Sequence, residues 1–193
     1  MPEWTNGAVS KTVVVLWATE GSNPSLSART GMTKYAALLR GISPLNPNMR
    51  NEKLRRVFEN LGFRNVRTVI SSGNVLFESH MKSRKALESK IEKAIDEQLG
   101  FKSSTIIRSQ GQFNRLIEKD PFEGKPDVPE SRLNVTFLKR GGEVFSAIDT
   151  TSTGTPNVML QIEKEHGKEI TTRTWKTVGR IMNEFGKMNQ KKG

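Results

Sequence analysis

The chain of 193 residues contains no cysteine and only two histidines. Without cysteine it can form no disulfide bond, no thiolate metal site and no cysteine nucleophile, which is typical of a protein of the reducing cytoplasm. His80 and His166 lie far apart, and neither belongs to a cluster with the spacing of zinc ligands. We therefore expect a cytoplasmic protein with no metal site and no cofactor.

Long apolar runs and the common catalytic motifs are also lacking. Before Met32 the one apolar run is residues 13–18, which is too short to span a bilayer and falls short of a secretory signal core. We find no phosphate-binding loop, dinucleotide-binding glycine pattern, nucleophile elbow or paired-carboxylate motif. We therefore expect no membrane partner, and no familiar enzyme class is indicated.

Positive charge, in contrast, is abundant. The chain has 31 Lys and Arg residues against 20 Asp and Glu residues, a net charge of +11. Residues 1–31 hold two charges of each sign, so the whole excess lies from Met32 onward. Such a chain attracts polyanions such as nucleic acid. The alternative is a domain whose lysines only keep it soluble.

Residues 1–31 differ in character from the rest of the chain. Residues 20–28 are rich in Gly, Ser, Asn and Pro and resemble a translated transfer-RNA gene, whose TΨC arm encodes Gly-Ser-Asn-Pro in one frame. We expect a disordered extension here, with the true start of translation at Met32. A genuine disordered extension would have the same composition.

Residues 32–108 show the periodicity of a ferredoxin-like subdomain. Strands are expected at 34–40, 65–70, 74–78 and 105–108. One helix buries Leu54, Val57, Phe58 and Leu61, with Asn48 as its expected N-cap and Gly62 as its end. A second helix is expected at 83–99, closed by Gly100. The order strand, helix, strand, strand, helix, strand is the split βαβ pattern.

Residues 109–187 predict a second, smaller α+β subdomain. Ser109 and Gln112 form a capping box, and a hairpin is expected at 133–138 and 144–148. A helix is expected at 156–166, with Thr155 as its N-cap. A last helix carries an apolar stripe that includes Trp175. Residues 121–130 read as a linker, and residues 188–193 as a basic, frayed tail.

Two polar blocks of the first subdomain are candidate sites. Arg40 follows an apolar strand and precedes glycine, so its guanidinium emerges at the strand end, where it suits a phosphate or carboxylate. A structural ion pair or a carbonyl cap is the alternative. Ser71, Ser72 and Asn74 bracket Gly73 in the expected hairpin turn, where Gly and Asn suit a positive φ angle. No activating base accompanies the serines.

A third polar block precedes Trp175. Thr171, Thr172, Arg173 and Thr174 are expected at the start of the last helix, where backbone N–H groups, hydroxyls and an arginine would form an anion site. An ordinary threonine N-cap is the alternative. Trp175 itself is expected to pack in the core, although a base-stacking platform would use the same side chain.

Together, three blocks resemble a known family: residues 38–42 (Leu-Leu-Arg-Gly-Ile), 72–75 (Ser-Gly-Asn-Val) and 172–178 (Thr-Arg-Thr-Trp-Lys-Thr-Val). Their order and spacing are similar to those of the domain-of-unknown-function 1697 family, from about Met32 to Phe185. The resemblance implies a small bacterial cytosolic protein of two α/β subdomains, the first ferredoxin-like, and implies no activity. Residues 43–48 replace the family's flexible Asn-Gly-Gly loop with a stiffer, proline-containing one.

These observations predict a non-catalytic module that binds an anionic small molecule or nucleic acid. The predicted ligand-binding residues are Arg40, Ser72, Asn74, Thr172 and Arg173. The alternative is an enzyme that acts on a small anionic metabolite in the cleft between the subdomains. Its general base would be Asp149, His80 or His166, although the sequence shows no catalytic partner residues for any of them. A third hypothesis is a dimerising or interaction protein that uses an exposed sheet edge. The oligomeric state is not indicated by the sequence.

The assignment of Met32 as the start of translation predicts the mass of the native protein. Intact-mass spectrometry of protein from its natural source should give a species that begins at Met32. A mature species that begins upstream of Met32 would contradict this assignment.

Overall fold

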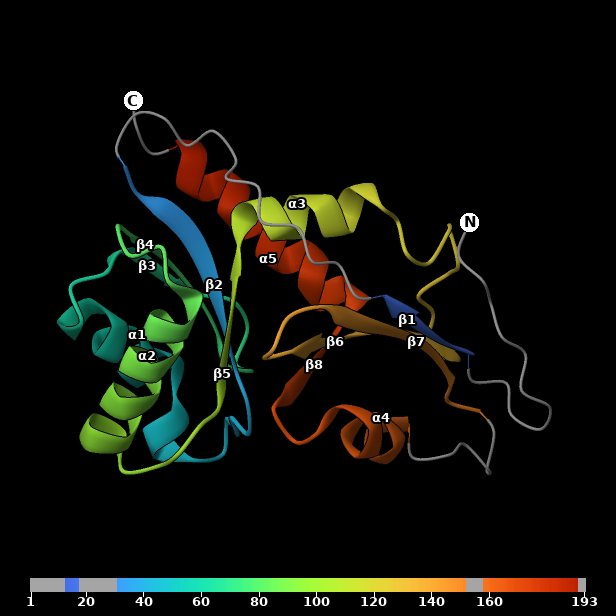
Figure 1. Cartoon of the computed structure of the whole chain (residues 1–193), viewed down its shortest axis with the longest axis horizontal. Coiled ribbons are helices and arrows are strands. Elements are labelled where there is room, and N and C mark those ends of the chain that lie inside the picture. The colour runs from blue at the N-terminus through green and yellow to red at the C-terminus, as the bar shows by residue number, and fades with distance from the viewer. Residues whose placement is uncertain (1–12, 18–30, 152–157, 191–193) are drawn as a thin grey trace. The chain divides into compact units, whose positions relative to one another are not determined.

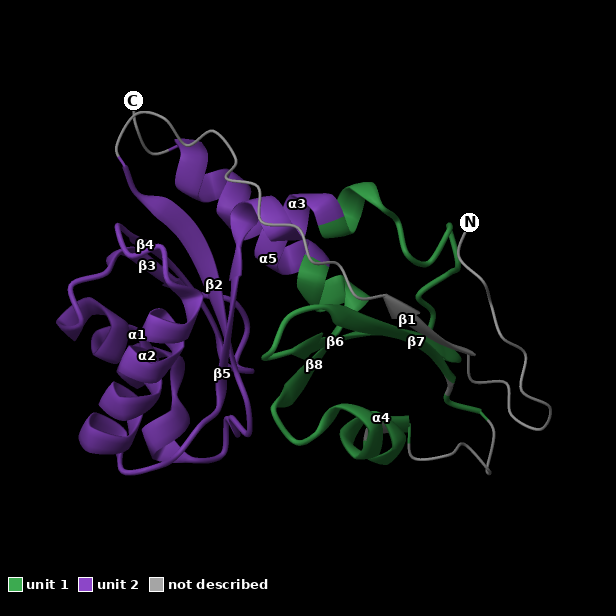
Figure 2. Ribbon diagram, viewed as in Figure 1, with its two compact units in different colours: residues 1–22, 116–178 green, residues 23–115, 179–193 purple. Residues whose placement is uncertain are grey.

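The computed structural model describes residues 13–17, 31–151 and 158–190, and this part of the chain contains two four-stranded sheets (Figure 1). The chain divides into two compact units, which Figure 2 colours separately. Unit 1 consists of Met1–Ser22 and Leu116–Val178, and unit 2 of Asn23–Arg115 and Gly179–Gly193. Unit 2 therefore runs past the predicted boundary at residue 108 to Arg115, and it also includes the C-terminal part of the last helix, from Gly179.

Unit 2 has the predicted ferredoxin-like fold. Its strands are β2 (Thr33–Leu39), β3 (Arg64–Thr68), β4 (Asn74–Ser79) and β5 (Thr105–Ser109). They form a sheet in the order β3-β4-β2-β5 with antiparallel neighbours. Helix α1 (Asn51–Asn60) connects β2 to β3, and α2 (Arg84–Leu99) connects β4 to β5. The split βαβ order predicted from the sequence is therefore confirmed.

The two helices and one face of this sheet enclose an apolar core. Alternate strand residues face the helices, and the buried members of the core come from all these elements: Tyr35, Ala37, Leu39, Leu54, Val57, Phe58, Val75, Phe77, Leu87, Ile91, Ile95 and Ile107. The period of two in the strands and of nearly four in the helices produces this arrangement. β2 therefore lies in the centre of the sheet with its helix-facing side fully covered.

Most of the predicted helix ends are confirmed. Ser83 caps α2 by accepting a hydrogen bond from the N–H of Ala86, and Gly100 follows in the left-handed conformation with φ of 73°. The prediction of Asn48 as the cap of α1 is wrong. Asn46 instead caps a short 3₁₀ helix, η1 (Pro47–Met49), and α1 begins after Arg50 without a side-chain cap. Pro44 and Pro47 are thus compatible with one tight helical turn inside the loop at residues 43–48.

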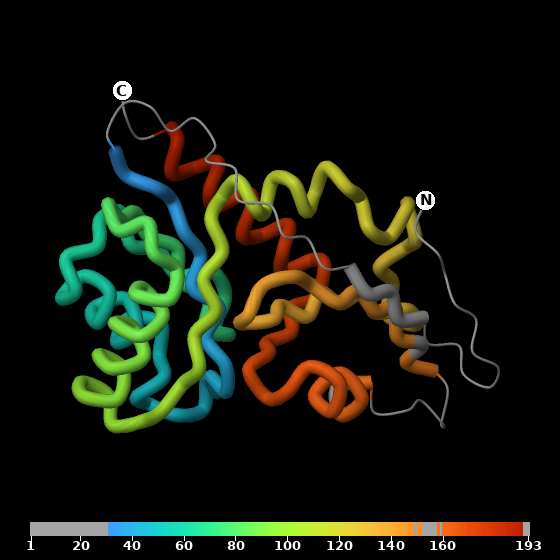
Figure 3. The backbone as a smooth tube through the Cα atoms, viewed as in Figure 1, coloured from blue at the N-terminus to red at the C-terminus, as the bar shows by residue number. Residues whose placement is uncertain are grey.

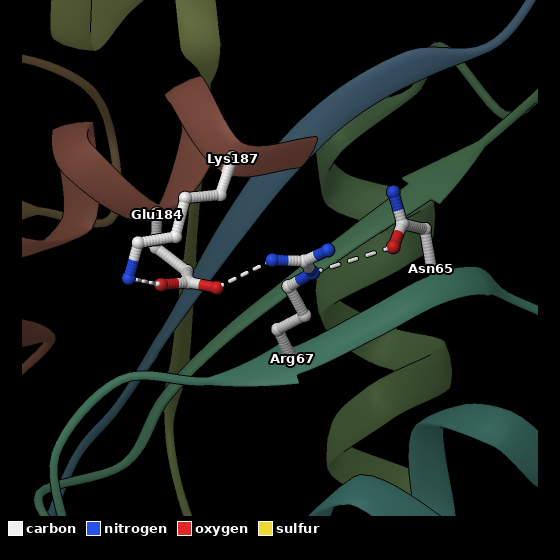
Figure 4. A network of polar contacts seen from close by, with 4 residues as sticks. All are labelled: Asn65, Arg67, Glu184 and Lys187. Carbon is white, nitrogen blue, oxygen red and sulfur yellow. Dashed lines mark hydrogen bonds and ion pairs between the residues drawn. The ribbon is translucent and has the colours of Figure 1, made fainter. Parts of the chain in front are cut away.

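The other face of the unit 2 sheet receives the end of the chain. Helix α5 (Trp175–Gln190) is tied to β3 by an ion pair in which Arg67 Nη1 lies 2.6 Å from Glu184 Oε1. Figure 4 shows Lys187 on the second oxygen of the same carboxylate, at 3.0 Å. Lys34 of β2 also donates to Asn189. These contacts place residues 179–190 with unit 2 rather than in a separate subdomain.

Unit 1 is a sheet with the strand order β1-β7-β6-β8. Its strands are β1 (Val13–Trp17), β6 (Ser131–Leu138), β7 (Glu143–Asp149) and β8 (Ile170–Thr174). Helix α4 (Val158–His166) packs on one face, where Val158 and Ile162 join an apolar cluster with Leu138. Phe122 contacts Phe145 and Trp175 within the unit. Trp175 is half-buried and packs edge-on against Phe122, so it is a packing residue but not part of the fully buried core that was expected.

The capping box is confirmed in both directions. Before helix α3 (Gln110–Glu118), the N–H of Ser109 donates to Gln112 Oε1 at 2.9 Å, and the N–H of Gln112 donates to Ser109 Oγ at 3.3 Å. The two residues therefore satisfy two of the donors left free at the start of this helix.

Three predictions need correction. Residues 171–174 form strand β8 rather than the start of the last helix, which begins at Trp175 with Thr174 accepting from the N–H of Thr177. The helix continues to Gln190, and Met188 is buried, so residues 188–190 are not a frayed tail. Residues 13–17 form β1, which pairs with β7, where a disordered extension was predicted. Residues 1–12, 18–30 and 191–193, and the predicted cap Thr155, lie outside the described residues.

The ion pair between Arg67 and Glu184 predicts a specific pH dependence. Burial alone would raise the pKa of Glu184, but hydrogen bonds and charge from Arg67 and Lys187 outweigh it, so this pKa lies below its ordinary value. A lowered pKa stabilises the fold above the unfolded pKa, about 4.3, and this stability is lost as the pH falls through the folded pKa. Glu184→Gln should therefore cost about 1 kcal/mol at pH 7 and less at pH 3.

Denaturant unfolding of both proteins at the two pH values measures this difference. Glu97→Gln is the matched control, because the ion pair of Glu97 with Lys93 is exposed and should contribute under about 0.5 kcal/mol. A constant stability difference between wild type and Glu184→Gln from pH 7 to pH 3 would contradict the assignment.

Candidate functional site

Two of the three polar blocks meet at the end of strand β2. The N–H of Leu39 donates to the carbonyl of Gly73 at 2.8 Å, and the N–H of Arg40 donates to the carbonyl of Ser104 at 2.9 Å. The hydroxyl of Ser103 donates to the carbonyl of Arg40 at 2.8 Å. Figure 3 shows β2 and β5 running side by side. Both backbone groups of Arg40 are therefore held by the segment just before β5, which fixes where its half-buried side chain begins.

The turn between β3 and β4 approaches β2 so closely that only glycine fits. Gly73 has φ of 72°, and a Cβ atom there would lie 2.5 Å from Ile42 Cγ1 and 3.0 Å from Leu39 Cβ. Real Cβ atoms do not approach carbon this closely. Gly73 thus joins the Ser-Gly-Asn block to the Arg-Gly-Ile block in space, as a matter of packing.

Asn74 has a structural role in this turn. Its side chain is buried, and its Nδ2 donates to the carbonyl of Val69 at 3.1 Å and to Ser72 Oγ at 2.9 Å. These bonds stabilise the turn from inside. Ser72 is half-buried and accepts from Asn74, so its own hydroxyl hydrogen can be donated elsewhere.

The loop after Arg40 is held in one conformation and exposes an apolar tip. The N–H of Asn46 donates to the carbonyl of Ser43, and the N–H of Asn48 donates to Asn46 Oδ1 at 2.9 Å. Leu45, between these anchors, is 92% exposed. The stiffness expected from Pro44 and Pro47 is therefore matched by local hydrogen bonds.

Arg173 and Thr172 belong to β8 of unit 1 and are not placed relative to Arg40. Arg173 is buried, and its Nη1 donates to Thr171 Oγ1 and to the carbonyl of Thr172, both at 2.8 Å. Burial lowers the pKa of Arg173 to about 10, which still leaves it protonated at neutral pH. Thr172 Oγ1 lies 2.7 Å from Thr136 Oγ1 on the neighbouring strand.

Sequence reasoning missed a third arginine. Arg108 of β5 is the largest fully buried side chain in the described part of the chain, and its Nη1 donates to the carbonyl of Ile107 at 3.0 Å. The signal was present in the sequence, because Arg108 follows Ile106 and Ile107 in the apolar strand predicted at 105–108. An arginine in such a position requires internal partners.

The positive charge is unevenly divided between the two units. Residues 32–115 hold sixteen Lys and Arg residues against seven Asp and Glu residues, and residues 179–193 hold four against one. Residues 116–178 of unit 1 hold nine against ten. Unit 2 therefore carries the whole positive excess, and unit 1 is nearly neutral.

The two histidines suggested as general bases belong to different units, His80 to unit 2 and His166 to unit 1. His80 is exposed, and His166 Nδ1 lies 2.7 Å from Arg140 Nη2. No three His, Asp or Glu side chains in the described ranges are placed to hold a metal ion. None of the helices in those ranges is both long and apolar enough to cross a membrane.

The close approach at Gly73 predicts a large effect of one methyl group. Gly73→Ala should destabilise the protein by about 2–4 kcal/mol, because backbone strain adds to the clash with Ile42. Gly100→Ala is the matched control: Gly100 has φ of 73°, but a Cβ atom there meets nothing within 4 Å, so about 1–2 kcal/mol is expected. Equal losses in denaturant unfolding would contradict the close approach.

The chain was compared with known proteins. Residues 32–166 match the family model described as protein of unknown function (DUF1697), which includes the first two polar blocks and ends before the third. The solved structure of the conserved bacterial protein SP0830 from Streptococcus pneumoniae is similar, with a TM-score of 0.66 and 24% identity over 80% of this chain and 99% of that one. This likeness supports the fold alone. Among curated proteins, none matches the chain. Because the family model covers well over half of the sequence, the chain belongs to the DUF1697 family.

Proposed function

We propose that this protein binds an anionic ligand without catalysing a reaction on it, through unit 2 and with Arg40 at the contact. The observation that carries this proposal is the segregation of charge, since unit 2 holds the whole positive excess beside a nearly neutral unit. A field from one unit draws a polyanion to that unit's surface and raises its association rate. Nucleic acid is the favoured ligand because many phosphates can use a spread of charge.

Arg40 is the residue of unit 2 that is best placed for a phosphate. Its backbone is fixed by hydrogen bonds to Ser103 and Ser104, just before β5, so less conformational entropy is lost when its side chain binds. Its guanidinium offers a planar set of donors suited to phosphate oxygens. The hydroxyl of Ser72, on the adjoining turn, supplies a further donor.

The other predicted ligand residues have a supporting role in this proposal. Asn74 holds the turn that carries Ser72, through its bond to the carbonyl of Val69. Arg173 and Thr172 stabilise β8 in unit 1, where Arg173 is buried among threonines and donates to them. We therefore assign ligand contact to Arg40 and Ser72, and stability to Asn74, Thr172 and Arg173.

Fluorescence anisotropy with labelled single-stranded RNA and duplex DNA, measured with the full chain across a salt series, tests this proposal. Binding should weaken steeply with salt, because neutralised phosphates release counterions. Arg40→Ala should weaken binding by about tenfold and reduce the salt slope by about 1. Arg64→Ala is the matched control: it removes an exposed arginine from the same unit and should have a smaller effect.

Each alternative outcome has a definite meaning. Equal losses for Arg40→Ala and Arg64→Ala would show a generic basic surface and contradict the role of Arg40. No binding to either nucleic acid at about 0.15 M salt would contradict the nucleic-acid ligand, and isothermal titration with inorganic phosphate would then test the remaining anion-binding claim.

A further inference from the structure

We propose that helix α2 closes the outer edge of strand β5 with its glutamates, so that β5 cannot pair with a strand of a second copy of this chain. β5 is the last strand of the unit 2 sheet and pairs on one side with β2. A strand in this position normally presents a row of unpaired N–H and C=O groups, which is a template for strand addition. The inference is independent of the proposed ligand.

The phase of the ladder shows which groups face outward. The N–H of Arg40 bonds to the carbonyl of Ser104, and hydrogen-bonded and non-hydrogen-bonded pairs alternate in an antiparallel ladder. Thr105 and Ile107, one and three residues farther along, therefore direct their N–H and C=O groups away from β2. These are the groups that a further strand would use.

Side chains of α2 occupy the outward N–H groups of Thr105 and Ile107, and the third outward N–H of β5, that of Ser109, donates to Gln112 Oε1. Glu92 Oε1 accepts from the N–H of Thr105 at 2.7 Å, and Glu88 Oε1 accepts from the N–H of Ile107 at 3.0 Å. The spacing fits: four residues of helix rise about 6 Å, and two residues of strand about 6.6 Å. One helical turn is thus in register with the alternate residues of the strand.

Arg108 donates a hydrogen bond to an outward-facing carbonyl of the same strand edge. Arg108 Nη1 donates to the carbonyl of Ile107 at 3.0 Å, so both backbone groups of Ile107 have partners outside the sheet. Glu88 and Arg108 are both almost completely buried, which a charged side chain accepts only when it is paired. Charge-assisted hydrogen bonds to the backbone supply that pairing.

This arrangement limits the hypothesis that the protein associates through an exposed sheet edge. A second chain that added to β5 would have to displace two carboxylate bonds that already satisfy the strand. Glutamate side chains from α2 therefore protect this edge. Other proteins protect a sheet edge with a proline or a bulge in the strand.

The test compares self-association of full-length variants by size-exclusion chromatography with light scattering over a range of concentrations. Glu88→Ala with Glu92→Ala should self-associate at an at least tenfold lower concentration than wild type. Glu88→Gln with Glu92→Gln should behave as wild type, because the amide oxygens still accept. The matched control is Glu59→Ala with Glu97→Ala, which removes two exposed helical glutamates and should also behave as wild type.

Hydrogen exchange of the wild-type protein gives a test that does not depend on the variants folding. The amides of Thr105 and Ile107 should exchange within about tenfold of the rate of Ile106, whose N–H faces β2. Exchange more than a hundredfold faster at Thr105 and Ile107 would overturn the proposal. A folded alanine variant with wild-type association, or a glutamine variant that associates like the alanine variant, would overturn it as well.

Discussion

The architecture around the candidate site depends on the close approach of the β3–β4 turn to the end of β2. Gly73 lies against Ile42 and Leu39 in a space that admits no Cβ atom, and its carbonyl accepts the N–H of Leu39. This contact joins two sequence blocks separated by about thirty residues. The next residue, Arg40, has its backbone fixed by Ser103 and Ser104 at the point where β2 leaves the sheet, so the start of its side chain has a defined position.

Local signals in the sequence predicted the elements of the fold well. The capping box at Ser109, the cap at Ser83 and the glycine at position 100 are interactions within a few residues, so the sequence alone contains both partners. The error at residues 171–174 has a physical cause. Threonine is both a helix cap and a β-branched strand former, and here one run has both roles: the first residues form β8, and Thr174 caps α5.

Contacts between distant residues were not predictable in the same way. The bond of Arg67 to Glu184 joins β3 to the last helix, and the bonds of Glu88 and Glu92 to β5 depend on the distance between a helix and a strand. Each of these contacts can be inferred only when the positions of the helices and strands are known. The candidate site shows the same limit: the sequence identified Arg40 and Arg173 alike, whereas the structure places Arg40 half-buried at a strand end and Arg173 buried within β8. The proposal therefore gives ligand contact to Arg40 and a stabilising role to Arg173.

Chemical-shift mapping by NMR tests the central claim most directly. The full-length protein, labelled with ¹⁵N, would be titrated with a short single-stranded RNA at about 0.1 M salt. The account predicts that shifted amides concentrate in unit 2 around Arg40, Ser72 and Ser104, with few changes in residues 116–178. Shifts concentrated in residues 116–178, or shifts in unit 2 that leave the surroundings of Arg40 unchanged, would contradict it.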